Sequence, residues 1–263
     1  EAPLLKNIIL DKLGTWSVRK GTDKLGSTTA GSDRIWGLGA YNESDGTHTF
    51  FRIANRDLEK LSSATWSAVD TDEWPASTKV NMVNFQDRLY LGSADGATAL
   101  AYTTGTTITD VAPKMGGSHL AVCKSRIAVG GNSIKPNIIF WTLPYTDTFY
   151  DATGTCAANA DSGGANTVTT TTEIFEAYHE GAAYIYNTDT SEMFLITGFT
   201  DGDTVTTDGD TSSWDSDTVY VLIDYIVLDG ECTGITTYQE RFIGFDEDAM
   251  YQWDPASTWT RKM

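Results

Sequence analysis

The sequence predicts an all-β protein: a partial or interrupted β-propeller of four-stranded blades, with an inserted small β-barrel or β-sandwich module. Three observations predict it. A short arginine-led motif recurs four times, short β-type segments alternate with Gly/Asp/Asn turns, and one internal stretch holds acidic residues without any basic ones. Recurring meanders of short strands are the sequence signature of propeller blades.

Composition excludes several classes of protein. The 263 residues include 18 Lys+Arg and 36 Asp+Glu, for a net charge of −18. Nucleic-acid binding is driven by basic side chains that displace counterions, so we expect no sequence-specific nucleic-acid binding. No window reaches the roughly 18 apolar residues of a membrane span, and we expect no membrane insertion. The three cysteines, Cys123, Cys156 and Cys232, form no CxxC pair and predict free thiols.

The repeated motif is a polar pair, an arginine, three mostly apolar residues and a glycine at or near the end. Its copies are Ser32-Asp-Arg-Ile-Trp-Gly-Leu-Gly39, Gln86-Asp-Arg-Leu-Tyr-Leu-Gly92, Lys124-Ser-Arg-Ile-Ala-Val-Gly130 and Gln239-Glu-Arg-Phe-Ile-Gly-Phe245. A second strand follows each copy after a turn: 49–53, 98–102, 137–141 and 249–253. The turns at 44–46, 94–96, 130–132 and 246–248 contain residues that tolerate the positive φ of tight hairpins.

The repeated arginines are Arg34, Arg88, Arg126 and Arg241, at spacings of 54, 38 and 115 residues. Removing an insert of about 70 residues from the last interval leaves about 45, which is close to the length of a propeller blade. We expect each arginine to be structural, lying over its strand and pairing with an acidic neighbour. A ring of arginines that binds a ligand is the alternative.

Four blades are visible, and the chain ends ten residues after Trp253. Either the propeller closes with four blades, or the remaining ones lie in another polypeptide or in a further C-terminal part. An unclosed propeller exposes strand edges and an apolar blade face, so we expect a neighbouring partner. The chain starts Glu-Ala-Pro, without an initiator methionine or a charged and then apolar leader.

The charge divides the chain into domains. Between Lys135 and Arg241 there is no Lys or Arg, while residues 136–240 hold 18 Asp and Glu. A stretch rich in Gly, Ser, Ala and Asn at 153–165 predicts a linker. We therefore expect propeller blades in 1–154, an inserted acidic β module in 155–225 and a continuation of the propeller in 226–263.

The acidic module contains several Asp-rich turns. Asp201, Asp203, Asp208 and Asp210 are weak candidates for calcium ligands, because Ca²⁺ prefers carboxylate oxygens. Their spacing does not match an EF-hand loop, and a solvated acidic surface is the expected alternative. We expect no cofactor.

No catalytic motif is present. The three histidines, His48, His119 and His179, lie outside any HExxH pattern, and GxSxG and GxxxxGK[ST] are both absent. Ser93-Ala-Asp-Gly-Ala-Thr98 only approaches the Asp-box of sialidase-like propellers. Four tryptophans are candidates for stacking on sugars or for an interface, although such residues more often pack between blades: Trp66, Trp74, Trp214 and Trp259. We predict that the protein is not an enzyme.

Several segments resemble propeller-type structural proteins of tailed bacteriophages, such as tail nozzle, hub or head-to-tail stabilising proteins. The opening run at 4–21 is similar to their entry strand, with Lys20 where the family usually has proline. The segments 124–132, 136–144 and 148–152 resemble one of their blades, and 192–206 resembles small β modules of phage virions. The resemblance implies a location in the virion, in its tail or head-to-tail region, with no catalytic residues.

We therefore expect a non-enzymatic, ring-forming virion protein that binds copies of itself and neighbouring portal, adaptor or tail proteins. The acidic module either faces a DNA channel, where it repels the phosphate backbone, or faces solvent. The alternative function is a carbohydrate-binding adhesin or receptor-binding protein with a β-propeller fold.

Overall fold

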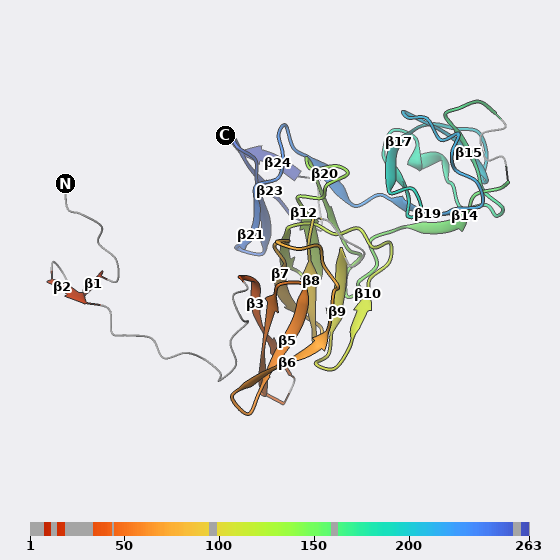
Figure 1. The fold of residues 1–263 in the computed structure, drawn as a ribbon. Coiled ribbons are helices and arrows are strands. Elements are labelled where there is room, and N and C mark those ends of the chain that lie inside the picture. The colour runs from red at the N-terminus through yellow and green to blue at the C-terminus, as the bar shows by residue number, and fades with distance from the viewer. Residues whose placement is uncertain are drawn as a thin grey trace.

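The computed structural model describes residues 34–43, 45–94, 99–158 and 163–254, together with the backbone of three short strands at the two ends of the chain. The fold is all-β, as predicted. In the described residues, the strands form four four-stranded antiparallel sheets, one six-stranded sheet and the two-stranded pair of β1 (Ile8–Asp11) and β2 (Thr15–Val18). The four sheets follow one another as blades, and the six-stranded sheet stands beside them (Figure 1).

Each blade is an up-and-down meander. Blade 1 contains β3 (Ile35–Asn42), β4 (His48–Ala54), β5 (Asp57–Ser62) and β6 (Thr65–Asp70). Blade 2 contains β7 (Asn81–Phe85), β8 (Arg88–Gly92), β9 (Leu100–Thr103) and β10 (Ile108–Asp110). Blade 3 contains β11 (His119–Cys123), β12 (Arg126–Gly130), β13 (Ile138–Trp141) and β20 (Tyr225–Val227). Blade 4 contains β21 (Gly234–Tyr238), β22 (Arg241–Phe245), β23 (Met250–Trp253) and β24 (Trp259–Lys262).

The blades pack in chain order. Their first strands lie side by side in the order β3, β7, β11, β21, and β3 and β21 form no comparable contact among the described residues. Three apolar clusters fill the spaces between the sheets. Phe51 and Leu91 belong to the cluster between blades 1 and 2, Tyr90 and Ile127 to the one between blades 2 and 3, and Trp253 to the one between blades 3 and 4. This arrangement is an open β-propeller.

The polar pair of the motif forms the tight turn before the second strand of the blade. In blade 2 both residues of this turn have positive φ, 48° at Gln86 and 54° at Asp87. The pairs Lys124-Ser125 and Gln239-Glu240 have the same conformation, with φ between 46° and 59°. Two successive left-handed residues define the type I′ turn, whose twist matches that of the flanking strands. The motif therefore encodes a hairpin turn followed by a buried strand.

One detail of the predicted repeat is wrong. Arg34 precedes β3, the first strand of its blade, whereas Arg88, Arg126 and Arg241 each begin the second strand. A motif of a turn and one strand carries no information about the position of that strand in its sheet. The turn at 246–248 contains no residue with positive φ. The carboxylate of Asp246 accepts hydrogen bonds from the backbone N–H groups of this turn and shapes it.

The insertion interrupts blade 3 between its third and fourth strands. Its sheet has the order β14-β19-β16-β17-β18-β15, with β14 at Ala152–Thr155 and β19 at Thr218–Leu222. The inner strands are β16 (Tyr184–Asn187), β17 (Glu192–Phe199) and β18 (Thr204–Thr207), and β15 spans Thr167–Thr169. A bridge between Cys156 and Thr170 joins the two edges. The sheet therefore curls into a small barrel, hereafter the inserted barrel.

The sheet of the inserted barrel begins at Ala152 and ends at Leu222, whereas the sequence predicted a module at 155–225. Tyr225, placed at the end of that module, begins β20, which pairs with β13 of blade 3. The Gly/Ser/Ala-rich stretch is therefore not the linker itself, since β14 occupies its first residues and pairs with β19.

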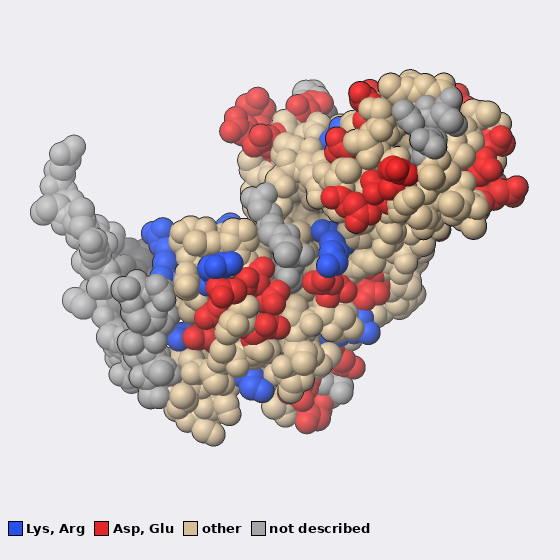
Figure 2. Space-filling view, turned by 45° about the vertical axis from the view of Figure 1, so that its right-hand side comes forward, with Lys and Arg blue, Asp and Glu red and all other residues tan. Residues whose placement is uncertain are grey.

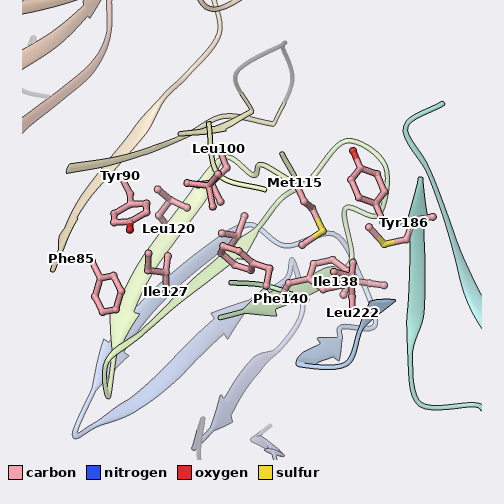
Figure 3. Close-up of a cluster of buried hydrophobic side chains, with 14 residues drawn as sticks. Phe85, Tyr90, Leu100, Met115, Leu120, Ile127, Ile138, Phe140, Tyr186 and Leu222 are labelled. Atoms are coloured by element: carbon pink, nitrogen blue, oxygen red, sulfur yellow. The ribbon is translucent and has the colours of Figure 1, made fainter. Parts of the chain in front are cut away.

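The inserted barrel also packs against the propeller. Tyr186, Met193 and Leu222 of the barrel lie in the same buried cluster as Phe140 and Ile138 of blade 3 (Figure 3). The ring of Tyr184 meets that of Phe140 edge-on, with the centroids 6.4 Å apart. Because this contact is apolar and buried, it orients the barrel on the side of the propeller.

The one helical segment in the described part of the chain is the short 3₁₀ turn η1 (Ala177–His179). No helix there has the length and apolarity to cross a membrane.

Candidate functional site

The two connections between the inserted barrel and blade 3 are each held by an ion pair with an arginine of the blades. One connection runs from β13 to β14 and contains Asp147; the other runs from β19 to β20 and contains Asp224. A repeat arginine pairs with each of these carboxylates. We call these two connections the roots of the barrel.

Arg88 binds the first root. Its Nη1 atom lies 2.6 Å from Oδ2 of Asp147, and its guanidinium stacks on Tyr102 with 4.1 Å from Cζ to the ring centroid. The hydroxyl of Tyr90 donates to the same carboxylate oxygen across 3.3 Å. Burial raises the pKa of Tyr90 to about 12, so this phenol keeps its proton at neutral pH. The first root is thus held by a charged and a neutral donor from blade 2.

Arg126 binds both roots. Its Nη1 atom donates to the carbonyl oxygen of Thr142 at 2.8 Å, where the chain leaves β13, and to Oδ2 of Asp224 at 3.0 Å, where it returns. Burial raises the pKa of Asp224 and the nearby Arg126 charge opposes that rise. One guanidinium therefore holds together two chain segments that the whole barrel separates in sequence.

These contacts correct the partners expected for the arginines. The carboxylates paired with Arg88 and Arg126 lie 59 and 98 residues away in sequence, not beside them. Arg34 is exposed, with its guanidinium over the ring of Trp36 at 5.2 Å, and Arg241 is exposed on blade 4. Arg88 and Arg126 are each paired with a different carboxylate, so their guanidinium groups are engaged by the protein itself. Sequence reasoning missed Asp147 and Asp224, since no local pattern links them to their partners.

A buried histidine lies near the first root. Oδ2 of Asp151 accepts hydrogen bonds from the Tyr178 hydroxyl at 2.5 Å and from Nε2 of His179 at 3.0 Å. Nδ1 of His179 accepts the backbone N–H of Glu176, which assigns the ring proton to Nε2. Burial raises the pKa of Asp151, but the hydrogen bonds from Tyr178 and His179 outweigh it and hold that pKa below its usual value. Both ring nitrogens are engaged and the ring is fully buried, so this group anchors η1 and has no free site for proton transfer.

The four calcium candidates accept hydrogen bonds from the barrel itself. Oδ1 of Asp208 accepts the N–H of Leu195 at 2.7 Å, and Oδ1 of Asp210 accepts the N–H of Ser212 at 2.9 Å. Asp201 accepts the N–H of Asp203, two residues on. Within the described ranges, no three His, Cys, Asp or Glu side chains gather as a metal ion requires. The four aspartates therefore have a structural role that their spacing did not reveal.

An acidic hollow of about 450 Å³ lies beside blade 4, lined by Asp229, Gly230, Glu231, Asp246, Glu247 and Asp248. The carboxylate of Asp246 accepts the hydroxyl of Tyr251 at 2.7 Å and backbone N–H groups of Gly230, Asp248 and Ala249. The hydrogen bond from Tyr251 is the main reason that the pKa of Asp246 is lowered. The oxygens of Asp246 are occupied by the turn, and among the described residues no three carboxylates gather as a metal ion requires.

Three of the four tryptophans proposed for sugar stacking are buried. Trp74 and Trp214 are 0% and 1% exposed, and Trp66 is 7% exposed. Trp66 lies under the guanidinium of Arg52, and Trp214 donates its indole N–H to Glu192 at 2.7 Å while stacking on Phe194. These three residues are therefore core residues and not sugar-stacking surfaces, because large aromatic side chains contribute most to stability when they fill a core. The side chain of Trp259 lies outside the described residues.

Acidic side chains are spread over the inserted barrel, whereas acidic and basic side chains are mixed over the blades (Figure 2).

A smaller hollow of about 240 Å³ lies between the barrel and blades 2 and 3, and Lys114 and Asn132 lie on its propeller side. Asn132 is committed to the backbone, since it donates to the carbonyl of Gly116 and accepts the N–H of Ile134. Lys114 pairs with Asp110.

No protein-family model matches the chain, and no curated protein matches it. Among solved structures, it is similar to the computationally designed Ika8 protein, with 14% identity, a TM-score of 0.32 and coverage of 90% of this chain and 76% of the other. It is also similar to the extracellular domain of BT4673 from B. thetaiotaomicron (9% identity, TM-score 0.29, 88% of this chain and 36% of that one). A third similarity is to BamB from Moraxella catarrhalis (11% identity, TM-score 0.25, 84% and 82%). These scores are too low to carry an argument, and the propeller assignment rests on the strand order.

Proposed function

We propose that this chain is a non-enzymatic structural protein of a tailed-bacteriophage virion, a component of a ring in the tail or head-to-tail region. Its partners are further copies of itself and the portal, adaptor or tail proteins around it. The resemblance of its blades to phage propeller proteins suggests this setting. The observation that carries the structural role is the open propeller, whose end blades lack a neighbouring blade among the described residues.

The contacts at the roots of the barrel support a structural role. Arg88 and Arg126 fasten both connections of the barrel, and an apolar contact orients it on blade 3. A module fixed in this way keeps its place when many copies assemble. The stretch from 136 to 240, which includes the whole barrel, contains no lysine or arginine. Such a surface repels phosphate groups, which suits a module that lies close to a passing genome.

The chemistry of the described residues also supports a role without catalysis. His179, Asp151 and Tyr178 are hydrogen-bonded to one another or to backbone, and Asp201 and Asp210 accept backbone N–H groups of their own turns.

Quantitative mass spectrometry of purified phage particles tests the proposal. The chain should be present at a fixed ratio to the major capsid protein, at a multiple typical of a ring, and an antibody against the inserted barrel should label the tail end of the capsid in electron micrographs. Absence of the chain from particles that infect normally would reject the virion role.

The carbohydrate-binding alternative loses its main support, since Trp66, Trp74 and Trp214 are buried. A glycan array on the purified chain separates the two functions, because an adhesin gives sugar-specific binding and a ring component does not.

A further inference from the structure

A shallow groove lies between the first strands of blades 1 and 2, and its walls are mostly apolar. Its volume is about 320 Å³. One wall is formed by residues 35–38 of β3, and the other by residues 79–82, which lead into β7 and begin it. Ile35 is 42% exposed and Leu38 is 68% exposed. Large apolar side chains exposed together mark surfaces that another segment or another protein covers. We call this feature the β3–β7 groove.

The two walls of the groove are fixed to each other. The backbone N–H of Val80 donates to the carbonyl oxygen of Trp36 at 3.2 Å. The walls also approach closely, since a Cβ atom at Gly37 would lie 2.7 Å from the carbonyl oxygen of Val80. A Cβ atom at Gly39 would lie 2.7 Å from Sδ of Met82. Because the groove is already formed, an occupant loses little free energy to reshaping it.

The hairpin of β1 and β2 offers an apolar face of its own. In the register of the two strands, Ile8 lies opposite Val18 and Leu10 lies opposite Trp16. Alternate residues of a strand belong to opposite faces, so these four apolar positions share one face of the hairpin. A two-stranded sheet is marginally stable on its own and needs a surface to pack against.

The connection between the hairpin and the groove favours a contact within one chain. Residues 19–34 join β2 to Ile35, the first residue of the groove. A connection of this length spans up to about 55 Å when extended, so the hairpin can reach both walls. A tethered segment has an effective concentration of roughly millimolar, which exceeds that of a second copy in a micromolar solution.

We propose that the apolar face of the β1–β2 hairpin packs into the β3–β7 groove of the same chain and holds blades 1 and 2 together. Each surface supplies the apolar cover that the other needs. The charges agree with this pairing, since Lys79 is the charged residue among the described lining of the groove and Asp11 is the charged residue of the two strands. The inference goes beyond the proposed function and does not rest on a location in the virion.

Hydrogen exchange of the full chain, followed by mass spectrometry, tests this contact. Backbone amides of β1 and β2 should be protected, because a packed hairpin opens rarely. Leu38→Asp places a charge in the groove and should speed their exchange about tenfold or more, while β4 and β5 keep their protection. Leu38 lies outside the hairpin and is largely exposed, so this loss reports the contact and not the folding of either part.

Two further variants complete the experiment. Trp16→Asp changes the hairpin side of the contact and should have the same effect as Leu38→Asp. Tyr145→Asp is the matched control, since Tyr145 is 74% exposed and lies in the first root, outside the groove. Protection of the hairpin in this control should equal that of the wild type.

A wild-type hairpin that exchanges freely overturns the proposal, as does protection that survives Leu38→Asp. Protection should be equal at low and high protein concentration. Protection that increases with concentration also overturns the proposal, because the groove then holds the hairpin of a second copy. None of these outcomes depends on whether the chain is found in virions, so the hairpin contact and the virion role can fail separately.

Discussion

Arg126 and Asp224 lie 98 residues apart in sequence, and their side chains meet at 3.0 Å where the chain enters and leaves the inserted barrel. The same guanidinium binds the carbonyl oxygen of Thr142. A blade can accept a large insertion between two of its strands only if the ends of the insertion return to the spacing of neighbouring strands. This ion pair holds them there.

Breaking this pair should destabilise the protein strongly. The side chains of Arg126 and Asp224 are only 14% and 26% exposed, so Arg126→Met leaves a largely buried carboxylate without its charge partner. We expect the free energy of unfolding in urea to fall by about 3 kcal/mol. Lys114→Met is the matched control: its pair with Asp110 is 55% and 37% exposed, and its loss should cost less than about 1 kcal/mol. Equal losses in both variants would contradict the structural role of Arg126.

The pH dependence of stability should include a contribution from Asp151. Hydrogen bonds from Tyr178 and His179 hold its pKa below the usual value, so the folded state favours the carboxylate. The resulting stability is present above the ordinary aspartate pKa and disappears as the pH falls through the lowered one. Tyr178→Phe removes one donor and should move the pKa of Asp151 upward, which carboxyl-carbon NMR titration can measure. Tyr145→Phe should leave that pKa unchanged.

The tryptophans should prove to be core residues. Trp74 is fully buried, and Trp74→Ala should lower the free energy of unfolding by about 3–5 kcal/mol. Trp214→Phe keeps most of the ring but removes the hydrogen bond to Glu192, so its cost should be smaller, about 1 kcal/mol. Denaturant titration measures both. If either variant instead kept full stability and lost binding to a sugar, the adhesin alternative would return.

The type I′ turns should respond to turn chemistry. Gln239 and Glu240 have φ of 47° and 59°, a conformation that Asn-Gly adopts at much lower cost. Replacing the pair by Asn-Gly should stabilise the protein by about 1 kcal/mol, whereas Glu240→Val should destabilise it, because a β-branched residue resists positive φ. Thermal unfolding of the two variants gives the comparison, and a change of the same sign in both would refute the assignment.

The charge of the inserted barrel should influence genome release if the barrel faces a DNA channel. Changing Asp201, Asp203, Asp208 and Asp210 to Lys should slow ejection, because the new charges bind phosphate. The same four changes to Asn remove the charge but keep the side-chain oxygen that accepts backbone N–H groups in these turns. Ejection should therefore slow in the Lys variant far more than in the Asn variant. Unchanged kinetics in the Lys variant would place the acidic surface away from the DNA.

Much of the architecture is local and was predictable from sequence. The motif around Arg88, Arg126 and Arg241 specifies a type I′ turn and a strand that is buried on both faces, as its unbroken run of mostly apolar residues indicates. The repeated motif of a turn and a strand was enough to predict the blades. The run without basic residues was enough to predict the inserted β module.

The tertiary structure alone decided how these parts are joined. It placed Asp147 and Asp224 opposite arginines from other strands, buried Trp74 and Trp214, assigned Tyr225 to blade 3 and put Arg34 before a first strand. The physical reason is the distance along the chain over which each effect acts. Turn and strand preferences act over a few residues, whereas burial and charge pairing depend on which distant segments meet, and that is set only when the blades pack.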